Sequence, residues 1–257
     1  MLAVERRNLI LEKLQDERKV VVSELSALFG VSEETIRRDL DKLDKEGLAV
    51  KSYGGAVLNE NSTLDMPFNI RKKRNMEGKQ TIANLVNTLV QEGEHIFIDP
   101  STTAVAIVKA LKSKRKLTVI TSSIEVLVEL SDVEGWDIIC TGGTLRENYL
   151  ALVGARATAA IDSFYADKVI LSCKGVDMEH GITDANEMFS QVKQTMLRSA
   201  KQRILAADHT KFGKVAFSRI CELSAIDMVV TDLCPDKEWI DYFARKGIGC
   251  LYGADVE

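Results

Sequence analysis

The stretch from residue 20 to residue 57 limits the possible folds of this chain more than any other segment. It predicts two short helices joined by a tight turn and followed by a small β-hairpin. Ser23 and Ser32 each stand at the start of an apolar helical pattern, and serine is a favoured N-cap because its hydroxyl accepts a backbone N–H of the first turn. Gly30 falls between the patterns, where the turn needs a left-handed residue.

Each predicted helix has one apolar face. Apolar residues recur at i, i+3 and i+4 in the first helix and at i, i+4 and i+7 in the second, which is typical of helices packed on a core. These residues are Leu25, Leu28 and Phe29 in the first helix and Ile36, Leu40 and Leu43 in the second.

The opposite face of the second helix carries a hydroxyl and several cations. Thr35, Arg38 and Lys42 lie on this face, with Arg37 beside them. A helix that enters the DNA major groove needs such side chains, because arginine binds guanine edges or phosphates and threonine contacts a phosphate or a thymine methyl. The pattern also fits an ordinary helical hairpin with a solvated charged face. Residues 48–57 then predict a two-stranded wing around a glycine turn.

The complete string of residues 22–48 favours the first interpretation. With its Ser-x-x-Thr-Ile-Arg-Arg-Asp-Leu run and the Gly54-Gly55 wing, it closely resembles the N-terminal winged helix-turn-helix of the DeoR family of bacterial transcription regulators. The resemblance implies that residues 33–43 form the recognition helix and that the partner is double-stranded operator DNA. The candidate DNA-binding residues are Ser32, Thr35, Arg37, Arg38, Lys42, Lys51 and Tyr53.

Length and composition suit a cytoplasmic protein with one small and one larger domain. The chain has 257 residues and a net charge of −4, and its first 57 residues hold nearly equal numbers of basic and acidic side chains. DNA binding must therefore depend on where the cations are placed. No run of apolar residues is long enough to span a membrane, and the charged amphipathic N-terminus does not predict a signal peptide.

The cysteines and histidines predict neither disulfides nor a metal site. The five cysteines are scattered through mostly apolar segments, which favours buried, reduced thiols, and the three histidines are also scattered. We expect no cofactor.

The predicted domains are a DNA-binding domain (1–57), a linker (58–75) and an α/β effector-sensing domain (76–257). Arg6 and Arg7, on a first predicted helix, either touch DNA phosphates or are simply solvated. The basic residues 71–74 either contact DNA or form the polar start of the next helix.

Short apolar runs alternate with helical patterns from His95 onward. This alternation predicts a mainly parallel sheet covered by helices on both faces, with ligands bound beyond the carboxyl ends of its strands. The runs are residues 96–98, 117–120, 136–140, 168–172, 203–207 and 228–231.

Hydroxyls and glycines follow four of these strands, in residues 99–103, 121–123, 141–144 and 208–211. Such residues before a helix can bind an anion through backbone N–H groups, and Lys211 adds a positive charge. Each loop alone also fits a simple helix cap. Four loops at equivalent strand ends favour a shared pocket for a phosphorylated small molecule.

Residues 78–232 resemble the effector-sensing domain of the same family, which is similar in fold to ribose-phosphate isomerases. Gly175, residues 181–184 and Lys193 also match its pattern, whereas Pro100 and Ser122 replace a frequent glycine and asparagine. The candidate effector-binding residues are Asp99, Ser101, Thr102, Thr103, Thr121, Ser122, Gly142, Gly143, Lys174, Asp208 and Lys211.

The leading hypothesis is a repressor of a carbohydrate-metabolism operon that responds to a phosphorylated sugar, as the resemblance implies. An alternative is a sugar-phosphate enzyme that uses Asp99, Asp184, Glu187 or Asp208 for acid–base chemistry. A third is a winged domain that binds protein instead of DNA. The family resemblance also implies a homodimer or homotetramer, with the sensing domain as the interface.

Overall fold

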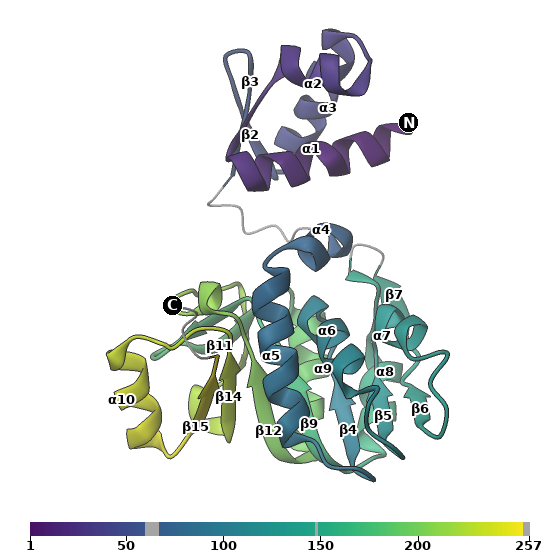
Figure 1. Cartoon of the computed structure of the whole chain (residues 1–257), viewed down its shortest axis with the longest axis vertical. Helices are drawn as coiled ribbons and strands as arrows, with labels where there is room; N and C mark the ends of the chain where they lie inside the picture. Colours follow the sequence, from purple (N-terminus) through teal and green to yellow (C-terminus); the bar gives the residue numbers. More distant parts are fainter. Residues whose placement is uncertain (60–66, 147–148, 254–257) are drawn as a thin grey trace. The chain divides into compact units, whose positions relative to one another are not determined.

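The computed structural model describes residues 1–59, 67–146 and 149–253. The chain forms two compact units, Met1–Arg71 and Lys72–Glu257 (Figure 1). Residues 60–66 of the predicted linker lie outside the described residues, and the rest of that segment includes a short helix, α4 (Phe68–Lys73).

The N-terminal unit is a winged helix-turn-helix. Its helices are α1 (Ala3–Glu17), α2 (Val22–Phe29) and α3 (Glu33–Lys45), and its strands are β1 (Lys19–Val21), β2 (Ala49–Ser52) and β3 (Gly55–Leu58). The three strands form an antiparallel sheet in the order β1-β3-β2. The predicted Ile36, Leu40 and Leu43 face is buried in the core of this unit.

Glycine makes the wing possible at two adjacent positions. Gly54 turns the hairpin with φ +79°, a left-handed conformation that glycine adopts without strain. Gly55 lies in β3 so close to β1 that an added Cβ would be 2.0 Å from the carbonyl oxygen of Val20. The predicted glycine turn is therefore confirmed, and the second glycine serves strand pairing.

The prediction that Ser23 caps α2 was wrong. The helix begins at Val22, two residues before the start that a Ser23 cap implies, because β1 runs directly into it and Val21 takes the N-cap position. The backbone N–H of Val22 donates to the carbonyl of Gly54 at 2.8 Å, so pairing with the wing helps to fix the start of this helix.

Leu28 was also wrongly assigned to the buried face of α2. It is 62% exposed, whereas Val22 and Leu25 are buried and Phe29 packs against the same core. The eight-residue helix turns Val22, Leu25 and Phe29 inward at i, i+3 and i+7, which leaves Leu28 on the rim.

The C-terminal unit is built around a seven-stranded sheet in the order β15-β14-β12-β9-β4-β5-β6. All of its neighbouring strands are parallel, which confirms the predicted fold class. The strands are β4 (His95–Ile98), β5 (Thr118–Thr121), β6 (Asp137–Cys140), β9 (Ala166–Leu171), β12 (Ala200–Ala206), β14 (Met228–Thr231) and β15 (Gly249–Tyr252).

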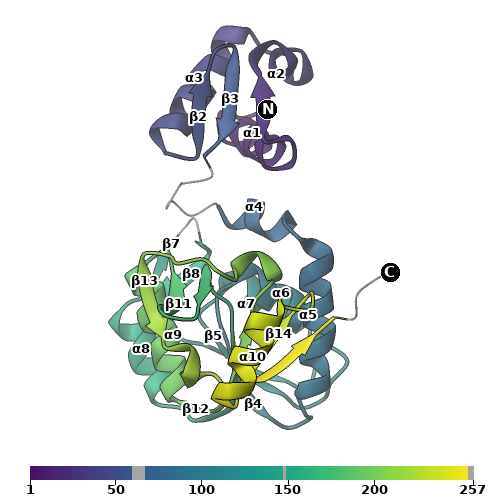
Figure 2. The same ribbon diagram turned by 90° about the vertical axis from the view of Figure 1, so that its left-hand side faces the viewer.

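Helices cover both faces of this sheet. Figure 2 shows α5 (Met76–Leu89) and α6 (Thr102–Leu111) on one side and α8 (Ala155–Asp162) and α9 (Glu187–Arg198) on the other. The remaining helices are α7 (Ile124–Glu129) and α10 (Lys237–Lys246). Fully buried Phe97, Val169, Leu205 and Val229 from four central strands anchor the core between the layers.

Two small antiparallel sheets lie outside this frame and were not predicted. One is the hairpin of β7 (Thr144–Arg146) and β8 (Ala151–Val153), and the other consists of β10 (Gly175–Asp177), β11 (Gly181–Asp184) and β13 (Ser218–Cys221). Strands of three or four residues leave little alternation to detect, and their partners lie far along the chain or across a loop.

The expectation of buried thiols held only in part. Cys173 is buried, but Cys140 and Cys234 are exposed because one ends the edge strand β6 and the other lies in the loop after β14. In the part of the chain that the structure describes, no helix is both long and apolar enough to cross a bilayer.

Candidate functional site

The start of α3 is fixed by the predicted serine cap. The Ser32 hydroxyl accepts a hydrogen bond from the backbone N–H of Thr35 at 3.3 Å and lies 3.0 Å from the Thr35 hydroxyl. Ser32 is therefore confirmed as the N-cap. Two hydroxyls are held together at the amino end of the helix, where the helix dipole also favours an anion.

The two arginines of α3 are exposed and paired with acids one turn earlier. Arg37 donates to Glu33 at 2.6 Å and Arg38 donates to Glu34 at 3.2 Å, and the arginine side chains are 53% and 76% exposed. Exposed i,i+4 pairs of this kind stabilise a helix by only about 0.3–0.5 kcal/mol. A DNA phosphate or guanine edge can therefore replace either carboxylate at little cost.

The wing presents two further candidates. Lys51 in β2 forms an ion pair with Asp41 of α3, and its hydrogen bond lowers the pKa of Asp41. Tyr53 occupies the tip of the hairpin with its side chain fully in solvent. Lys42 is likewise exposed on α3. The candidate contacts thus lie on α3 and on the hairpin that follows it.

Arg6 does not belong to this exposed set. It is only 7% exposed, and its Nε donates to Asp39 Oδ2 at 2.5 Å, while Arg7 lies 3.6 Å from the other oxygen of the same carboxylate. The two alternatives considered for Arg6, phosphate contact and solvation, were therefore both wrong. Its ion pair fixes α1 against α3.

In the C-terminal unit, the candidate loops share one edge of the sheet. Because neighbouring strands are parallel, the segments after β12, β9, β4, β5 and β6 all emerge at the carboxyl edge. With about 4.8 Å between strands, a ligand centred over β4 lies within about 10 Å of every one of these strand ends. Gly142 and Gly143, after β6, are four strands away from Asp208 and Lys211, after β12.

Asp99 and Lys193 form a fully enclosed polar cluster at the centre of this edge. Lys193 Nζ lies 3.1 Å from Asp99 Oδ2 and 2.5 Å from Asp184 Oδ2, and it donates to the Ser172 carbonyl at 2.7 Å. Burial opposes the lysine charge, but the carboxylates of Asp184 and Asp99 raise the pKa of Lys193 above its ordinary value. Lys193 therefore remains charged and contacts both carboxylates. Because the same lysine engages Asp99 and Asp184, this cluster does not distinguish one of them as a general acid or base.

Hydroxyls next to Asp99 stabilise the strand ends. The Ser101 hydroxyl donates to Asp99 at 2.7 Å and caps α6 by accepting from Ala104 N–H at 3.0 Å. The Thr121 hydroxyl donates to the Ile98 carbonyl at 2.8 Å and thereby ties β5 to β4. Thr102 and Thr103 form the buried first turn of α6, so its N-terminal backbone groups point toward this edge.

Ser122 differs from these hydroxyls. Its side chain is fully buried, yet among the described residues its Oγ has no hydrogen-bond partner. A buried hydroxyl without a partner is destabilising unless a ligand or water satisfies it. This residue therefore has hydrogen-bonding capacity to offer to an effector.

Two lysines supply the positive charge. Burial lowers the pKa of Lys174 to about 7, and the nearby charge of Lys211 shifts it in the same direction. Lys211 lies 3.7 Å from Asp208, whose other oxygen accepts from the Thr210 N–H at 3.0 Å. An anion arriving between these lysines would relieve their mutual repulsion and favour the protonated form of Lys174.

The sequence interpretation did not recognise the buried ion pairs of Lys193 and Asp39, although both leave a signal. Each charged residue interrupts an apolar stripe at helical spacing. Lys193 follows Phe189 by four positions on α9, and Asp39 follows Ile36 by three on α3. A charged residue at a core position of a helix predicts a buried partner.

Within the described residues, no cluster of three His, Cys, Asp or Glu side chains could hold a metal ion.

A winged DNA-binding unit and an α/β unit with polar strand ends together define a transcription regulator with a sensing domain. Known families agree with this class. The DeoR-like helix-turn-helix domain matches residues 6–62, and the DeoR C terminal sensor domain matches residues 74–233. The chain belongs to the DeoR family and is a DNA-binding transcription regulator.

Relatives with similar sequences cover nearly the whole chain. An uncharacterized HTH-type transcriptional regulator of Bacillus subtilis, YulB, is 39% identical over 90% of both chains. The HTH-type transcriptional repressor GlcR of the same species is 35% identical over 96% of this chain and 95% of its own. The glycerol-3-phosphate regulon repressor of Escherichia coli is 32% identical over 91% of this chain and 93% of its own.

A ribose 5-phosphate isomerase from Methanocaldococcus jannaschii also aligns, with a TM-score of 0.40 and 14% identity over 54% of this chain and 55% of that one. A likeness this weak says nothing about activity.

Proposed function

We propose that this regulator represses a carbohydrate-metabolism operon and that a phosphorylated sugar controls its affinity for the operator. The observation that carries the effector class is the pair Lys174 and Lys211 at the hydroxyl-lined carboxyl edge of the sheet, the edge at which α6 also begins. A phosphate matches this combination of cations and backbone N–H groups. Relatives named as repressors of a glycerol-3-phosphate regulon and of an aga operon support the same class.

The operator is bound by α3 and the wing. Arg37 and Arg38 contact phosphates or guanine edges, and Tyr53 and Lys51 contact the DNA backbone beside the groove. The residues proposed for this surface are Ser32, Thr35, Arg37, Arg38, Lys42, Lys51 and Tyr53.

The effector is bound at the carboxyl edge of the large sheet. Ser122 hydrogen-bonds the sugar, and Lys174, Lys211 and the start of α6 hold the phosphate. The residues proposed for this site are Asp99, Ser101, Thr102, Thr103, Thr121, Ser122, Gly142, Gly143, Lys174, Asp208 and Lys211.

The effector controls repression by binding one conformation of the protein more tightly than another. The protein acts in the cytoplasm as a homodimer or homotetramer associated through the sensing domain. A near-neutral DNA-binding domain makes few phosphate contacts by itself, and two winged units in one assembly double their number. The salt dependence of DNA binding then becomes steeper.

Thermal unfolding in the presence of phosphorylated sugars tests the effector class. A ligand that binds only the native state raises the melting temperature by mass action. We expect at least one sugar phosphate to raise it while its unphosphorylated parent does not. An equal effect of parent and phosphate, or no effect from any phosphate, would contradict an anion-reading site.

A further inference from the structure

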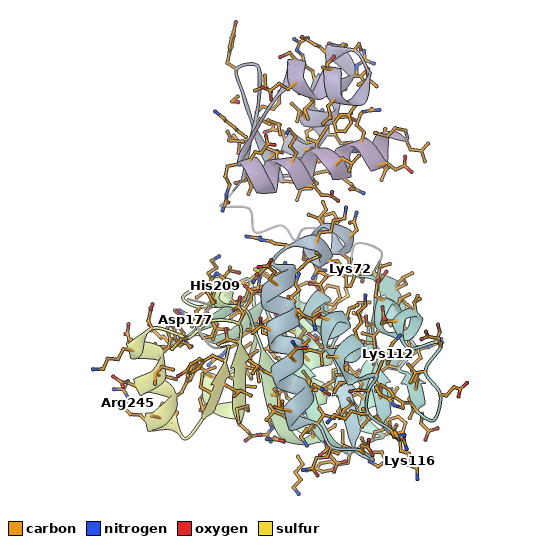
Figure 3. All side chains as sticks on the ribbon, viewed as in Figure 1. Lys72, Lys112, Lys116, Asp177, His209 and Arg245 are labelled. Atoms are coloured by element: carbon orange, nitrogen blue, oxygen red, sulfur yellow. The ribbon has the colours of Figure 1, made fainter. Side chains whose placement is uncertain are left out.

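The sensor unit begins with a junction, residues 72–78, that leads from α4 into α5. The N-terminal unit ends at Arg71, so the junction is the part of the sensor unit that is joined directly to the DNA-binding unit. Its side chains bond to Asp232, which contacts His209 in one candidate effector loop, and to Glu125, in the helix that follows another. Figure 3 labels two residues of these contacts, Lys72 and His209, on either side of the start of α5.

Asn75 holds the junction in an unusual backbone conformation. Its φ of +46° is left-handed, which costs an ordinary L-residue about 1–2 kcal/mol and is tolerated by asparagine when its side chain bonds locally. Its Oδ1 accepts from the Gly78 N–H at 3.3 Å and thereby caps α5. Its Nδ2 donates to Asp232 Oδ2 at 3.0 Å, so the conformation also depends on Asp232.

Gly78 permits the close approach of Asp232 to the junction. A Cβ at this position would lie 2.3 Å from Asp232 Oδ2 and 2.5 Å from Asn75 Nδ2. Any other residue would therefore displace the hydrogen bond between these two side chains.

Asp232 joins the junction to the loop of residues 208–211. Its side chain is 3% exposed; it accepts from the His209 N–H at 2.7 Å, and His209 Nδ1 lies 2.8 Å from its other oxygen. Burial opposes ionisation, but hydrogen bonds from Asn75 and His209 hold the pKa of Asp232 below its ordinary value. His209 directly follows Asp208, so one ionised carboxylate connects a candidate effector loop to the cap of α5.

A second set of contacts ties the other end of the junction. Lys72 Nζ lies 2.6 Å from Glu125 in the first turn of α7, just after Ser122 and Ser123. Buried Lys79 donates to the carbonyls of Lys72 and Arg74 and fixes the backbone between α4 and α5. The junction is thus held by α7, which follows the loop after β5, and by Asp232 after β14, which contacts the loop after β12.

We propose that Asn75, Asp232 and His209 form a relay that converts anion binding at the loop of residues 208–211 into a backbone change at the junction. This relay rests on the proposed effector site. An anion bound by Lys211 shifts the loop, and His209 moves with it and withdraws donors from Asp232. The carboxylate then rearranges, Asn75 loses its restraint, and the chain entering the sensor unit changes direction.

The substitution Asn75→Asp breaks this relay with minimal change of shape. The aspartate keeps an oxygen to cap Gly78, but it replaces the amide donor with a second carboxylate facing Asp232, which repels it. The matched control is Asn84→Asp, the same substitution on the exposed face of the same helix, where Asn84 accepts from Gln80. Asn75→Gly is a second test variant, because glycine adopts the left-handed conformation without the side-chain link.

Hydrogen exchange of the full chain measures the relay directly, with inorganic phosphate and glycerol 3-phosphate as probes. In the natural sequence, a probe should change the exchange rate by about fivefold or more both in residues 207–213 and in residues 74–80, which is the range of typical coupling. In Asn75→Asp and Asn75→Gly, only residues 207–213 should respond. Asn84→Asp should behave like the natural sequence.

The outcomes separate the relay from the effector site. A response confined to residues 207–213 in the natural sequence would overturn the relay and leave the anion site standing. A junction response that persists in both Asn75 variants would also overturn it. If neither segment responds to either probe, the anion site itself is wrong and the relay falls with it.

Discussion

Arg38 extends from α3 with its side chain 76% exposed and paired to Glu34. We predict that Arg38→Ala weakens DNA binding by about 1–3 kcal/mol, the usual loss for an arginine that contacts a base edge. The melting temperature should stay unchanged, because an exposed pair contributes little to stability. Fluorescence anisotropy with a duplex selected from random-sequence DNA measures the affinity.

The matched control for Arg38→Ala is Arg245→Ala, at an exposed position of α10 in the sensor unit. It removes the same charge from a helix that the account assigns no role in DNA binding. Equal affinities for the Arg38→Ala variant and the natural protein at moderate salt would remove α3 from the proposed interface.

We predict that Lys174 makes binding of the proposed effector depend on pH. Because its pKa is about 7 in the free protein and an anion needs the protonated form, affinity should fall as pH rises above 7, by up to tenfold per unit. Below about pH 6 a phosphate monoester loses its second charge, so binding should be strongest between these limits. Calorimetric titration with the sugar phosphate found by thermal unfolding measures this profile.

Lys174→Arg provides the control for the pH profile, since an arginine stays charged throughout this range. The decline above pH 7 should disappear in this variant while the decline at low pH persists. Identical alkaline limbs in the two proteins would show that another group controls the titration.

At the scale of elements, the Arg6–Asp39 pair holds α1 on α3. Asp39→Asn leaves the buried Arg6 without its counter-charge, and breaking a buried pair in this way costs about 3–5 kcal/mol. We predict a lower urea midpoint for the winged unit alone. Both tryptophans, Trp136 and Trp239, belong to the sensor unit, so circular dichroism should report the change while tryptophan fluorescence does not.

The double variant Arg6→Met with Asp39→Leu tests the cause. If the loss in Asp39→Asn comes from the unpaired charge, the apolar pair should restore much of the stability. A double variant less stable than Asp39→Asn would instead point to the shape of the two side chains.

Periodicity predicted the elements that have a long, regular face. The spacing of Ile36, Leu40 and Leu43 was sufficient for α3, and the apolar runs identified six of the seven strands of the large sheet. The predicted N-cap at Ser23 was wrong because the exact start of α2 is set by β1 and the wing. The small sheets of β7–β8 and β10–β11–β13 depend on pairing between segments that carry no local signal.

The candidate site was predictable as a set of loops, because parallel strands bring their carboxyl ends to one edge. The hydrogen bonds and ion pairs within the site were not predictable from the sequence. The contact of Lys193 with Asp99 and Asp184, and that of Asn75 with Asp232, join residues far apart in the chain. Spacing along a sequence cannot show which charged groups meet after folding.

At the scale of the whole molecule, DNA binding and sensing belong to units with separate hydrophobic cores. Communication between such units requires an effector that discriminates between two states of the complete chain. The junction at residues 72–78 provides the covalent route, and in the proposed relay Asn75 is the residue whose backbone changes conformation.

The most direct measurement is the operator affinity of the full chain with and without phosphorylated sugars, determined by fluorescence anisotropy. We predict that one sugar phosphate changes the dissociation constant by about 5–150-fold, the usual range of coupling between two sites. Its unphosphorylated parent should leave the affinity unchanged. If a sugar phosphate that stabilises the protein leaves operator affinity the same, sensing and DNA binding are not coupled and the account is wrong.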